Sequence, residues 1–231
     1  MATHFRNLSS EEASAEVDGR LVLVSTIVVR RPYLSFAKRV IDIVAIMLSS
    51  PFVVPLVLLL ALCVVLDGGK PFFTQDRLGR NGRVYRIWKL RTMVSDAEAR
   101  LQGYLDHNPD AKTEWDSLQK LKCDPRITTF GRLLRKSSLD ELPQLWNVLI
   151  GDMSLVGPRP MMCDQRVMYP GTAYFDLRPG ITGYWQISAR NEGTFSERAY
   201  FDTLYAHDVS LLTDLRILVA TVRVVIRGTG Y

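Results

Sequence analysis

The sequence predicts an α+β, mainly helical domain that is associated with a membrane. Residues 40–66 are almost wholly apolar, residues 72–93 contain the alternation of a strand, and much of the remaining chain has helical periodicity. The 231 residues are enough to bury a core. The formal net charge of +5 indicates an anionic partner: nucleic acid, a phosphorylated substrate or an acidic membrane surface.

Residues 1–32 are expected to be an extension outside the main domain. Residues 1–20 are polar and poor in large apolar side chains, which is typical of a mobile segment. Residues 21–29 are rich in valine and fit a short strand or an apolar contact segment, because they are too short to span a membrane. No basic start leads into an apolar core, so no secretory signal is expected and the N-terminus should remain inside the cell.

The cysteines and histidines do not suggest a metal or redox site. The three cysteines are widely spaced and form no Cys-x-x-Cys pair, which favours a reduced, cytoplasmic environment. The three histidines are also far apart in the sequence, so surface or structural roles are expected for them.

The apolar stretch at residues 40–66 would measure about 40 Å as one straight helix, more than the roughly 30 Å of a hydrocarbon core. Length alone therefore predicts a membrane span. Pro51 and Pro55 interrupt this simple picture, because proline lacks an N–H group and kinks a helix. The hydroxyls of Ser49 and Ser50 are expected to bond the carbonyls that the prolines leave without a partner.

Basic residues flank this stretch on both sides, which favours the cytoplasmic face for both ends. Broken at Ser50-Pro51, the two arms are about 16 and 24 Å long, and neither would cross alone. A re-entrant helix-break-helix over residues 33–69 satisfies both constraints, and a kinked single-pass anchor remains the alternative. Asp42 is expected to anchor the first arm, through the helix dipole or by pairing with Lys38 or Arg39.

The cytoplasmic domain is expected to comprise residues 70–231. Residues 79–82 form a hairpin-like turn before a strand at residues 84–91, which places Lys89 and Arg91 on one face. This basic edge either binds phosphate or simply faces solvent or lipid. Residues 95–122 read as a charged helical excursion interrupted at Asn108-Pro109, and no site is assigned there.

Two further helices are expected near the C-terminus, over residues 197–205 and 211–226. The second is amphipathic and cationic. It is expected either to lie in an anionic membrane interface or to pack on the core.

Residues 137–160 carry the densest chemistry in the chain, beginning with the adjacent carboxylates Asp140 and Glu141. Ser138 and Glu141 have the spacing of a capping box, and on these residues alone a structural cap is favoured. The surrounding sequence favours phosphate chemistry instead. The cations expected to bind phosphate or nucleotide are Arg135, Arg159, Lys89 and Arg91, and Pro158 and Pro160 stiffen the loop around Arg159.

Other enzyme classes fit this stretch less well. The two carboxyls of a glycosidase flank one bond about 5–9.5 Å apart, whereas neighbours on a helix diverge by about 100° around its axis. The glycine-rich loops of Walker-type and dinucleotide-binding proteins are both absent from the sequence.

Several motifs in order resemble the bacterial sugar transferases called monotopic phosphoglycosyl transferases. They comprise residues 89–93, 124–128, 137–160 and 178–183, and the resemblance extends from about Tyr33 to the C-terminus. The endings at residues 189–194 and 227–231 look most similar to the members that initiate exopolysaccharide synthesis. The excursion at residues 95–122 and the N-terminal extension depart from the family pattern.

The resemblance implies transfer of a sugar-1-phosphate from a UDP-sugar to polyprenol (undecaprenyl) phosphate, with Mg²⁺, through an aspartyl phosphosugar. By motif, Asp140 would be the nucleophile and Glu141 the magnesium ligand. Ser50 and Pro51 would form the re-entrant break. The implied location is the cytoplasmic face of the bacterial inner membrane, in contact with its lipids.

No nucleic acid partner is expected. The alternative function is a non-catalytic, membrane-anchored scaffold of polysaccharide assembly. The sugar and any homo-oligomer are left open.

Overall fold

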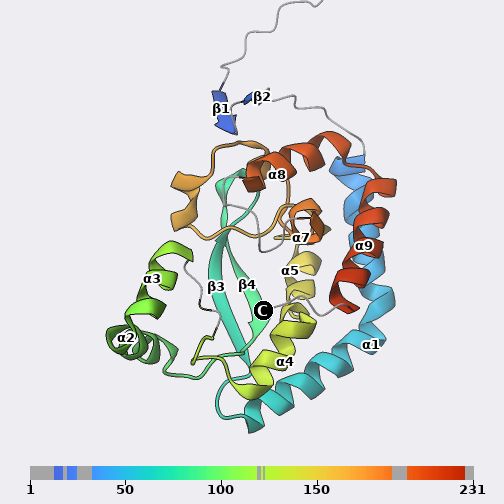
Figure 1. Cartoon of the computed structure of the whole chain (residues 1–231). Helices are drawn as coiled ribbons and strands as arrows, with labels where there is room; N and C mark the ends of the chain where they lie inside the picture. Colours follow the sequence, from blue (N-terminus) through green and yellow to red (C-terminus); the bar gives the residue numbers. More distant parts are fainter. Residues whose placement is uncertain are drawn as a thin grey trace, which may run out of the picture.

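The computed structural model describes residues 13–17, 20–24, 33–118, 121, 123–188 and 197–226. Most of them are helical, and the strands form three two-stranded sheets. This confirms the predicted α+β, mainly helical class. Figure 1 shows the helices arranged around the central β3–β4 hairpin, with α1 and α9 together on one side.

The described part of the N-terminal extension is a small antiparallel pair, β1 (Ala13–Val17) and β2 (Arg20–Val24). The strand predicted within residues 21–29 is confirmed for residues 21–24. The strand β1 was not predicted, because its five residues alone carry only a weak signal. Residues 1–12, 18–19 and 25–29, the remainder of the segments predicted at 1–20 and 21–29, lie outside the described residues.

Helix α1 (Lys38–Leu66) follows a π-helical turn, η1 (Tyr33–Ala37), and contains both Pro51 and Pro55. By length and composition it is apolar enough to cross a membrane, and most of it is not buried within the protein. The Ser50 hydroxyl donates to the Met47 carbonyl at 2.8 Å, which is the carbonyl that Pro51 leaves without a backbone donor, as predicted. The expected break is thus a change of direction within one helix (Figure 1).

The first half of α1 packs on the body through buried polar groups. Lys38 forms an ion pair with Asp214 of α9 (Leu211–Ile226). Asp42 accepts a hydrogen bond of 2.7 Å from the Ser154 hydroxyl. The pairing expected between Asp42 and Lys38 or Arg39 is therefore not what holds this end, because each group has found a long-range partner.

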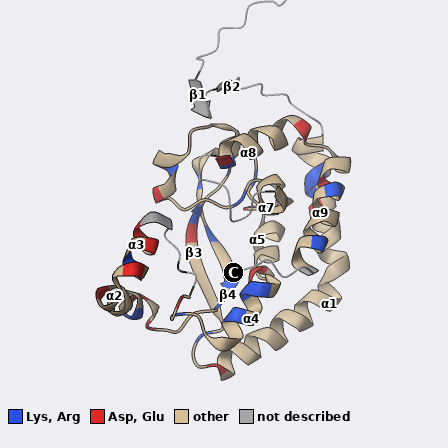
Figure 2. Ribbon diagram, in the orientation of Figure 1, with Lys and Arg blue, Asp and Glu red and all other residues tan. Residues whose placement is uncertain are grey.

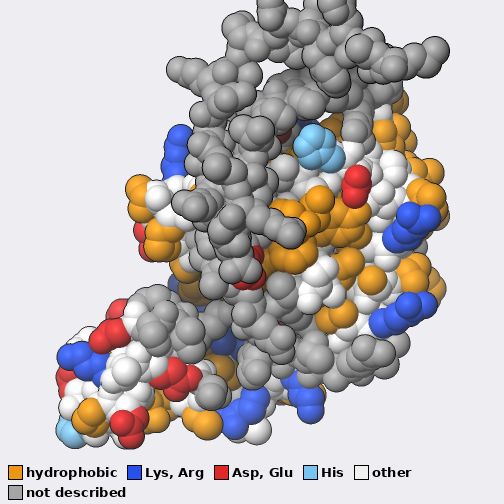
Figure 3. Space-filling model, turned by 45° about the horizontal axis from the view of Figure 1, so that its top comes forward, with side chains coloured by type: hydrophobic (Ala, Val, Ile, Leu, Met, Phe, Trp, Pro, Cys, Tyr) orange, Lys and Arg blue, Asp and Glu red, His pale blue; other side chains and the backbone are white. Residues whose placement is uncertain are grey.

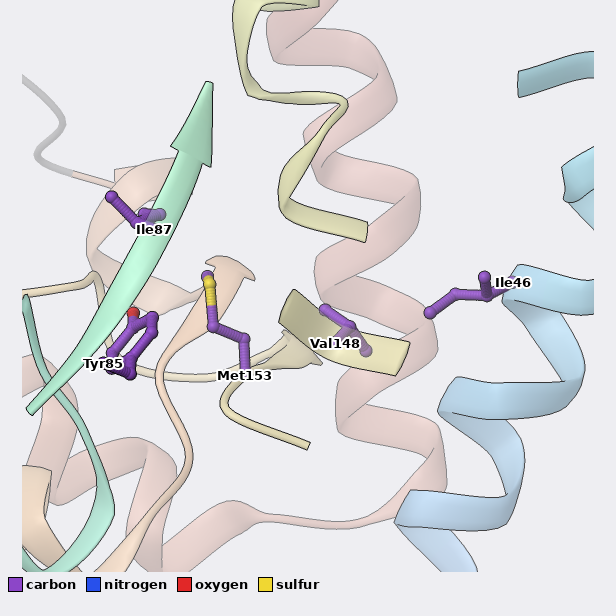
Figure 4. Close-up of a cluster of buried hydrophobic side chains, with 5 residues drawn as sticks. All are labelled: Ile46, Tyr85, Ile87, Val148 and Met153. Atoms are coloured by element: carbon purple, nitrogen blue, oxygen red, sulfur yellow. The ribbon is translucent and has the colours of Figure 1, made fainter. Parts of the chain in front are cut away.

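Apolar side chains continue this contact one turn further along α1. Ile46 belongs to a cluster with Tyr85, Ile87, Val148 and Met153, which joins α1 to β4 and to α5 and the loop after it (Figure 4).

The second half of α1 returns to the same body. Ala61 and Val64 are buried in a cluster with Leu90 and Leu134. The Arg91 guanidinium donates to the Val64 carbonyl at 3.0 Å and to the Gly68 carbonyl, so it caps the C-terminal end of the helix. Both ends of α1 are therefore attached to one folded unit.

The predicted hairpin is confirmed as β3 (Phe72–Leu78) and β4 (Val84–Leu90), paired antiparallel around the turn η2 (Arg80–Gly82). Asn81 adopts φ 58°, a left-handed conformation that asparagine tolerates in tight turns. The charged excursion is also confirmed, as α2 (Ala97–His107) and α3 (Pro109–Leu118).

The remaining elements build the site and its walls. In chain order they are α4 (Thr129–Ser137), η3 (Leu139–Glu141), α5 (Gln144–Ile150), β5 (Ser154–Val156), η4 (Asp164–Met168), α6 (Ala173–Asp176), β6 (Gly180–Thr182), α7 (Tyr184–Ser188), α8 (Glu197–Asp208) and α9. Strands β5 and β6 pair in parallel. A Cβ atom on Gly157 would lie 2.3 Å from the Arg178 carbonyl oxygen, so only glycine allows this close approach of the two segments.

The packing of helix α9 on the core, one of the two roles that the sequence left open, is confirmed, and its place in a membrane interface stays a prediction. Its buried Ile217 and Asp214 face the core, whereas Leu215, Val219 and Val222 are exposed. In Figure 3 this region, at the right, shows hydrophobic side chains with basic ones between them. The helix therefore packs on the body and also presents an apolar, cationic outer face.

Candidate active site

Asp140 and Glu141 lie in the short 3-10 turn η3, between α4 and α5. Ser138 ends α4 with φ 57°, a left-handed conformation, and makes no side-chain capping bond to η3. An N-cap residue has extended backbone geometry. The capping box predicted for Ser138 and Glu141 is therefore wrong, and the two acids are held on a tight reversal between helices.

The two carboxylates differ in their surroundings. Asp140 is 7% exposed, and burial raises its pKa to about 6, with a further rise from the Glu141 charge and opposing effects of Lys89 and Arg135. Glu141 forms an ion pair of 2.6 Å between its Oε1 atom and Lys89 Nζ. The turn thus places a buried carboxylate that is more basic than usual beside one that is ion-paired.

Two of the predicted cations meet at these acids. Lys89 reaches Glu141 from β4. Arg135 approaches from the last turn of α4, and its Nε donates to the Thr92 hydroxyl at 2.8 Å. Burial lowers the pKa of Arg135, while the nearby Asp140 charge acts in the opposite direction. Figure 2 shows basic residues gathered on α4 next to the hairpin, in contrast to the part of α1 after Asp42, which carries no charged side chain.

Arg159 extends this positive region from the loop after β5. Its guanidinium carbon lies 5.8 Å from the centre of the Trp185 ring, and the guanidinium carbon of Arg198 lies 5.3 Å from the same ring. The Pro158 carbonyl accepts a hydrogen bond of 2.8 Å from Gly180 N. The parallel pair β5–β6 therefore fixes the loop that carries Arg159.

Arg77 and Arg198 are site residues that the sequence reasoning missed. Burial lowers the pKa of both, to about 10 for Arg198, and the Arg159 charge lowers them further. Arg77 Nε is buried without a hydrogen-bond partner in the described part of the chain. Three guanidinium groups held this close favour an anionic ligand. Alternation along residues 72–78 was the available signal for Arg77.

A cavity of about 280 Å³ opens beside these groups. Glu141 and Arg159 contribute to its wall, together with side chains of α5, α7 and α9. A carboxylate, a guanidinium and an apolar surface therefore share one pocket.

A family model described as bacterial sugar transferase matches residues 33–228. The chain belongs to the bacterial sugar transferase family. This confirms the resemblance drawn from the motifs, which extended from about Tyr33 onwards.

Curated relatives agree with this family. The UDP-galactose-lipid carrier transferase of Erwinia amylovora is 44% identical over 197 residues, 84% of this chain and 41% of that protein. The exopolysaccharide production protein ExoY of Rhizobium meliloti is 43% identical over 206 residues, 87% of this chain and 90% of that protein. The UDP-glucose:undecaprenyl-phosphate glucose-1-phosphate transferase of Caulobacter vibrioides is 40% identical over 196 residues, 80% of this chain and 68% of that protein. The chain thus spans less than half of the first relative and most of ExoY.

The sugar transferase fold brings together most, but not all, of the residues predicted for the site. Asp140, Glu141, Lys89 and Arg135 converge, and Arg159 lies on the same cavity as Glu141. Arg91 instead caps α1, so its guanidinium is engaged in structure. Ser50 and Pro51 lie within α1.

The donor set for a metal ion is small. Among the described residues, no group of three or more His, Cys, Asp or Glu side chains is close enough to hold an ion. Mg²⁺ often binds through one or two carboxylates while substrate phosphates and water complete its octahedron. The adjacent acids Asp140 and Glu141 of η3 fit that mode, because they supply two neighbouring carboxylates.

Proposed function

We propose that this protein moves a sugar-1-phosphate from a UDP-sugar to polyprenol (undecaprenyl) phosphate, the first membrane step of exopolysaccharide synthesis. The observation that carries the proposal is the buried Asp140 on a tight turn beside Glu141, Lys89 and Arg135. A carboxylate in such a site is suited to covalent catalysis. The names of the relatives, which include UDP-galactose, UDP-glucose and undecaprenyl phosphate, support the substrate classes.

In the first step, an Asp140 carboxylate oxygen attacks the sugar-bearing phosphorus of the UDP-sugar. A bond forms between this oxygen and phosphorus, and the bond to the bridging oxygen of the diphosphate breaks. UMP leaves with the electron pair, and an aspartyl phosphosugar remains. Lys89 and Arg135 stabilise negative charge on the transferring phosphoryl oxygens, the largest contribution expected in phosphoryl transfer.

In the second step, a phosphate oxygen of the polyprenol phosphate attacks the same phosphorus. The bond to Asp140 breaks, the carboxylate is regenerated, and polyprenyl diphosphosugar is released. Because the bond between the sugar and its own oxygen stays intact, the charged side chains need to bind only phosphate. This explains how a site built from arginine, lysine and carboxylate serves the whole reaction.

Glu141 is the proposed ligand for Mg²⁺, with Asp140 beside it. When bound, the ion would neutralise charge on the diphosphate of the donor. Lys89 orients the Glu141 carboxylate through their ion pair of 2.6 Å. The Arg159 guanidinium is proposed to bind donor phosphate, with Arg77 and Arg198 adding to the positive field around it.

We also propose that α1 enters and leaves the membrane on the cytoplasmic face of the inner membrane. Two observations support this topology over a kinked single-pass anchor. A straight helix of 29 residues would place its ends about 44 Å apart. Yet Lys38 at one end and Val64 near the other both pack on the same folded body.

The topology is tested by labelling single cysteines in a variant without Cys63, Cys123 and Cys163. One reporter cysteine stands at position 36 and another at position 67, in intact cells and in permeabilised cells. We expect both to be labelled only after permeabilisation. Labelling of one of them in intact cells would establish a single-pass span.

The function is tested by trapping the covalent intermediate. Purified protein in detergent is incubated with UDP-sugar labelled in the sugar-bearing phosphate, with Mg²⁺ and without lipid acceptor. We expect label on the wild type and none on Asp140→Asn, with UMP released in the same proportion. Equal labelling of the two proteins would show that another residue is the nucleophile. UDP-galactose and UDP-glucose are the first donors to test, because relatives are named for both.

The scaffold alternative makes the opposite prediction in cells. A scaffold that uses the turn only as a helix cap would still complement a deletion strain after Asp140→Asn. In this alternative Asp140 and Glu141 only cap a helix, whereas the enzyme hypothesis predicts loss of complementation.

A further inference from the structure

We propose that the cavity beside Glu141 and Arg159 binds the phosphate-proximal isoprene units of the acceptor lipid. This rests on the proposed function and names where its second substrate lies. The cavity has a volume of about 280 Å³ and joins the catalytic turn to the inner side of α9. This is near the lower limit of small-molecule pockets, so it takes a short segment of a long chain.

The polar part of the cavity has unsatisfied hydrogen-bonding capacity. Gln186 of α7 is 7% exposed, and both its amide nitrogen and its amide oxygen are buried without a partner in the described part of the chain. A buried amide without partners costs free energy unless a ligand bonds it. The amide N–H groups suit a phosphate oxygen, and the Arg159 guanidinium on the same wall, which binds donor phosphate in the first step, can bind the acceptor phosphate after UMP has left.

The side chains that α9 contributes to the cavity have no unsatisfied hydrogen-bonding groups among the described residues. Leu218, Val224 and Val225 contribute aliphatic side chains. Thr221 also lines it, but its hydroxyl is bonded to Thr182 Oγ1 at 2.6 Å and donates to the Ile217 carbonyl at 2.8 Å. The wall is therefore hydrocarbon in character.

The two parts of the wall together favour a lipid phosphate. Arg159 and Gln186 lie at its polar part, and Leu218, Val224 and Val225 form its aliphatic part. An amphiphile with one anionic group and an aliphatic chain matches both parts of the wall. The same helix also carries an exposed apolar face, with Leu215 and Val219.

The test separates the two half-reactions. Leu218→Trp fills the cavity, and Leu215→Trp places the same ring on the exposed face of the same helix as a matched control. We expect Leu218→Trp to release UMP in the first turnover at the wild-type rate but to lose at least tenfold in kcat/KM for a long-chain polyprenol phosphate. Leu215→Trp should retain both rates within about twofold.

Three outcomes would overturn the inference. One is an unchanged acceptor reaction in Leu218→Trp, and another is an equal loss in Leu215→Trp. The third is a raised KM for the UDP-sugar in the first half-reaction, which would assign the cavity to the nucleotide. If thermal melting shows that Leu218→Trp is not folded, Val224→Met fills less of the same cavity and replaces it in the test.

Direct binding keeps this inference distinct from the proposed function. A polyprenyl phosphate with a photoreactive group on its first isoprene unit is added to protein in vesicles, without donor. We expect crosslinks to α9 that Leu218→Trp abolishes, and crosslinks elsewhere would refute the assignment. Absence of UMP release from every UDP-sugar would instead refute the proposed function. The crosslinking result would then still show whether the cavity binds the lipid phosphate.

Discussion

Two buried aspartates, Asp214 and Asp140, show how one residue type serves structure in one region and chemistry in another. Asp214 accepts hydrogen bonds of 2.7 Å from the hydroxyls of Tyr33 and Tyr205 and pairs with Lys38, and so ties α9 to the start of α1. Asp140 is equally buried, but its environment raises its pKa to about 6. The first acid is satisfied by its neighbours, whereas the second retains basicity that a reaction can use.

Replacement of Asp140 by asparagine should give the largest effect on activity. Transfer is expected to fall by at least about 10³-fold, because removing a nucleophile removes the covalent route. The same change should stabilise the fold. Since the folded-state pKa lies above the unfolded value of 3.8, ionised Asp140 destabilises the protein increasingly from about pH 4 to pH 6 and constantly above.

At pH 8 the free energy of unfolding of the asparagine variant should therefore exceed that of the wild type by up to about 3 kcal/mol, and its melting temperature should be higher. Near pH 4 the two proteins should be equally stable. Thermal melts at the two pH values measure this difference. If Asp140→Asn were less stable than the wild type at pH 8, Asp140 would stabilise the fold as Asp214 does, and the contrast between these two acids would be wrong.

Replacement of Asp214 by asparagine should have the opposite pattern. We expect a loss of about 3–5 kcal/mol in stability, since Lys38 would remain buried without its counter-ion. Denaturant unfolding in detergent measures the loss, and Asp208→Asn, which is also bonded to a tyrosine hydroxyl, is the control near the same helix. A melt like that of the wild type would show that the ion pair does not hold α1.

Removal of the Lys89 charge should show whether protonation of Asp140 controls the pH dependence of the rate. The wild-type rate is expected to fall below about pH 6 as Asp140 becomes protonated. The Lys89 charge lowers this pKa, so Lys89→Met should move the acid limb to higher pH and reduce activity several-fold at pH 6.

The acid limb of the pH–rate profile is measured as the rate of UMP release in the absence of acceptor, from pH 5 to pH 9. The exposed Lys136→Met serves as control. An unshifted limb in Lys89→Met would mean that another group controls the rate.

The smallest effect is expected within α1. Ser50→Ala should cost about 1 kcal/mol, because the Met47 carbonyl has no backbone donor opposite Pro51. Ser49→Ala is the matched control, since its carbonyl partner Ile46 can still be bonded by a backbone N–H. Equal melting temperatures for the two variants would contradict this account.

The sequence predicted the local structure around the site well. The hairpin turn at residues 79–82, the helix break at Asn108-Pro109 and the helix at residues 211–226 are each specified by neighbouring residues. The reversal at Ser138 was misread, because the capping-box spacing says nothing about the backbone conformation that α4 imposes on its last residue.

Long-range contacts account for the remaining differences. Lys38 and Asp214 are separated by 176 residues, and no local pattern links them. Arg91 has the same local character as Lys89, and its position at the end of α1 follows only from how the helix returns to β4. Arg77 and Arg198 join Arg159 through the fold alone.

The same distance between Lys38 and Asp214 bears on biosynthesis. At roughly 5–20 residues per second, synthesis of the intervening 176 residues takes about 10–35 s. Throughout this interval Lys38 lacks Asp214, its partner in the folded protein, whereas Ser154, the partner of Asp42, follows Asp42 by only 112 residues. Lys38 and Asp42 are four residues apart, a spacing that allows them to face each other on one side of a helix. This spacing offers Lys38 a nearby counter-charge until Asp214 is made.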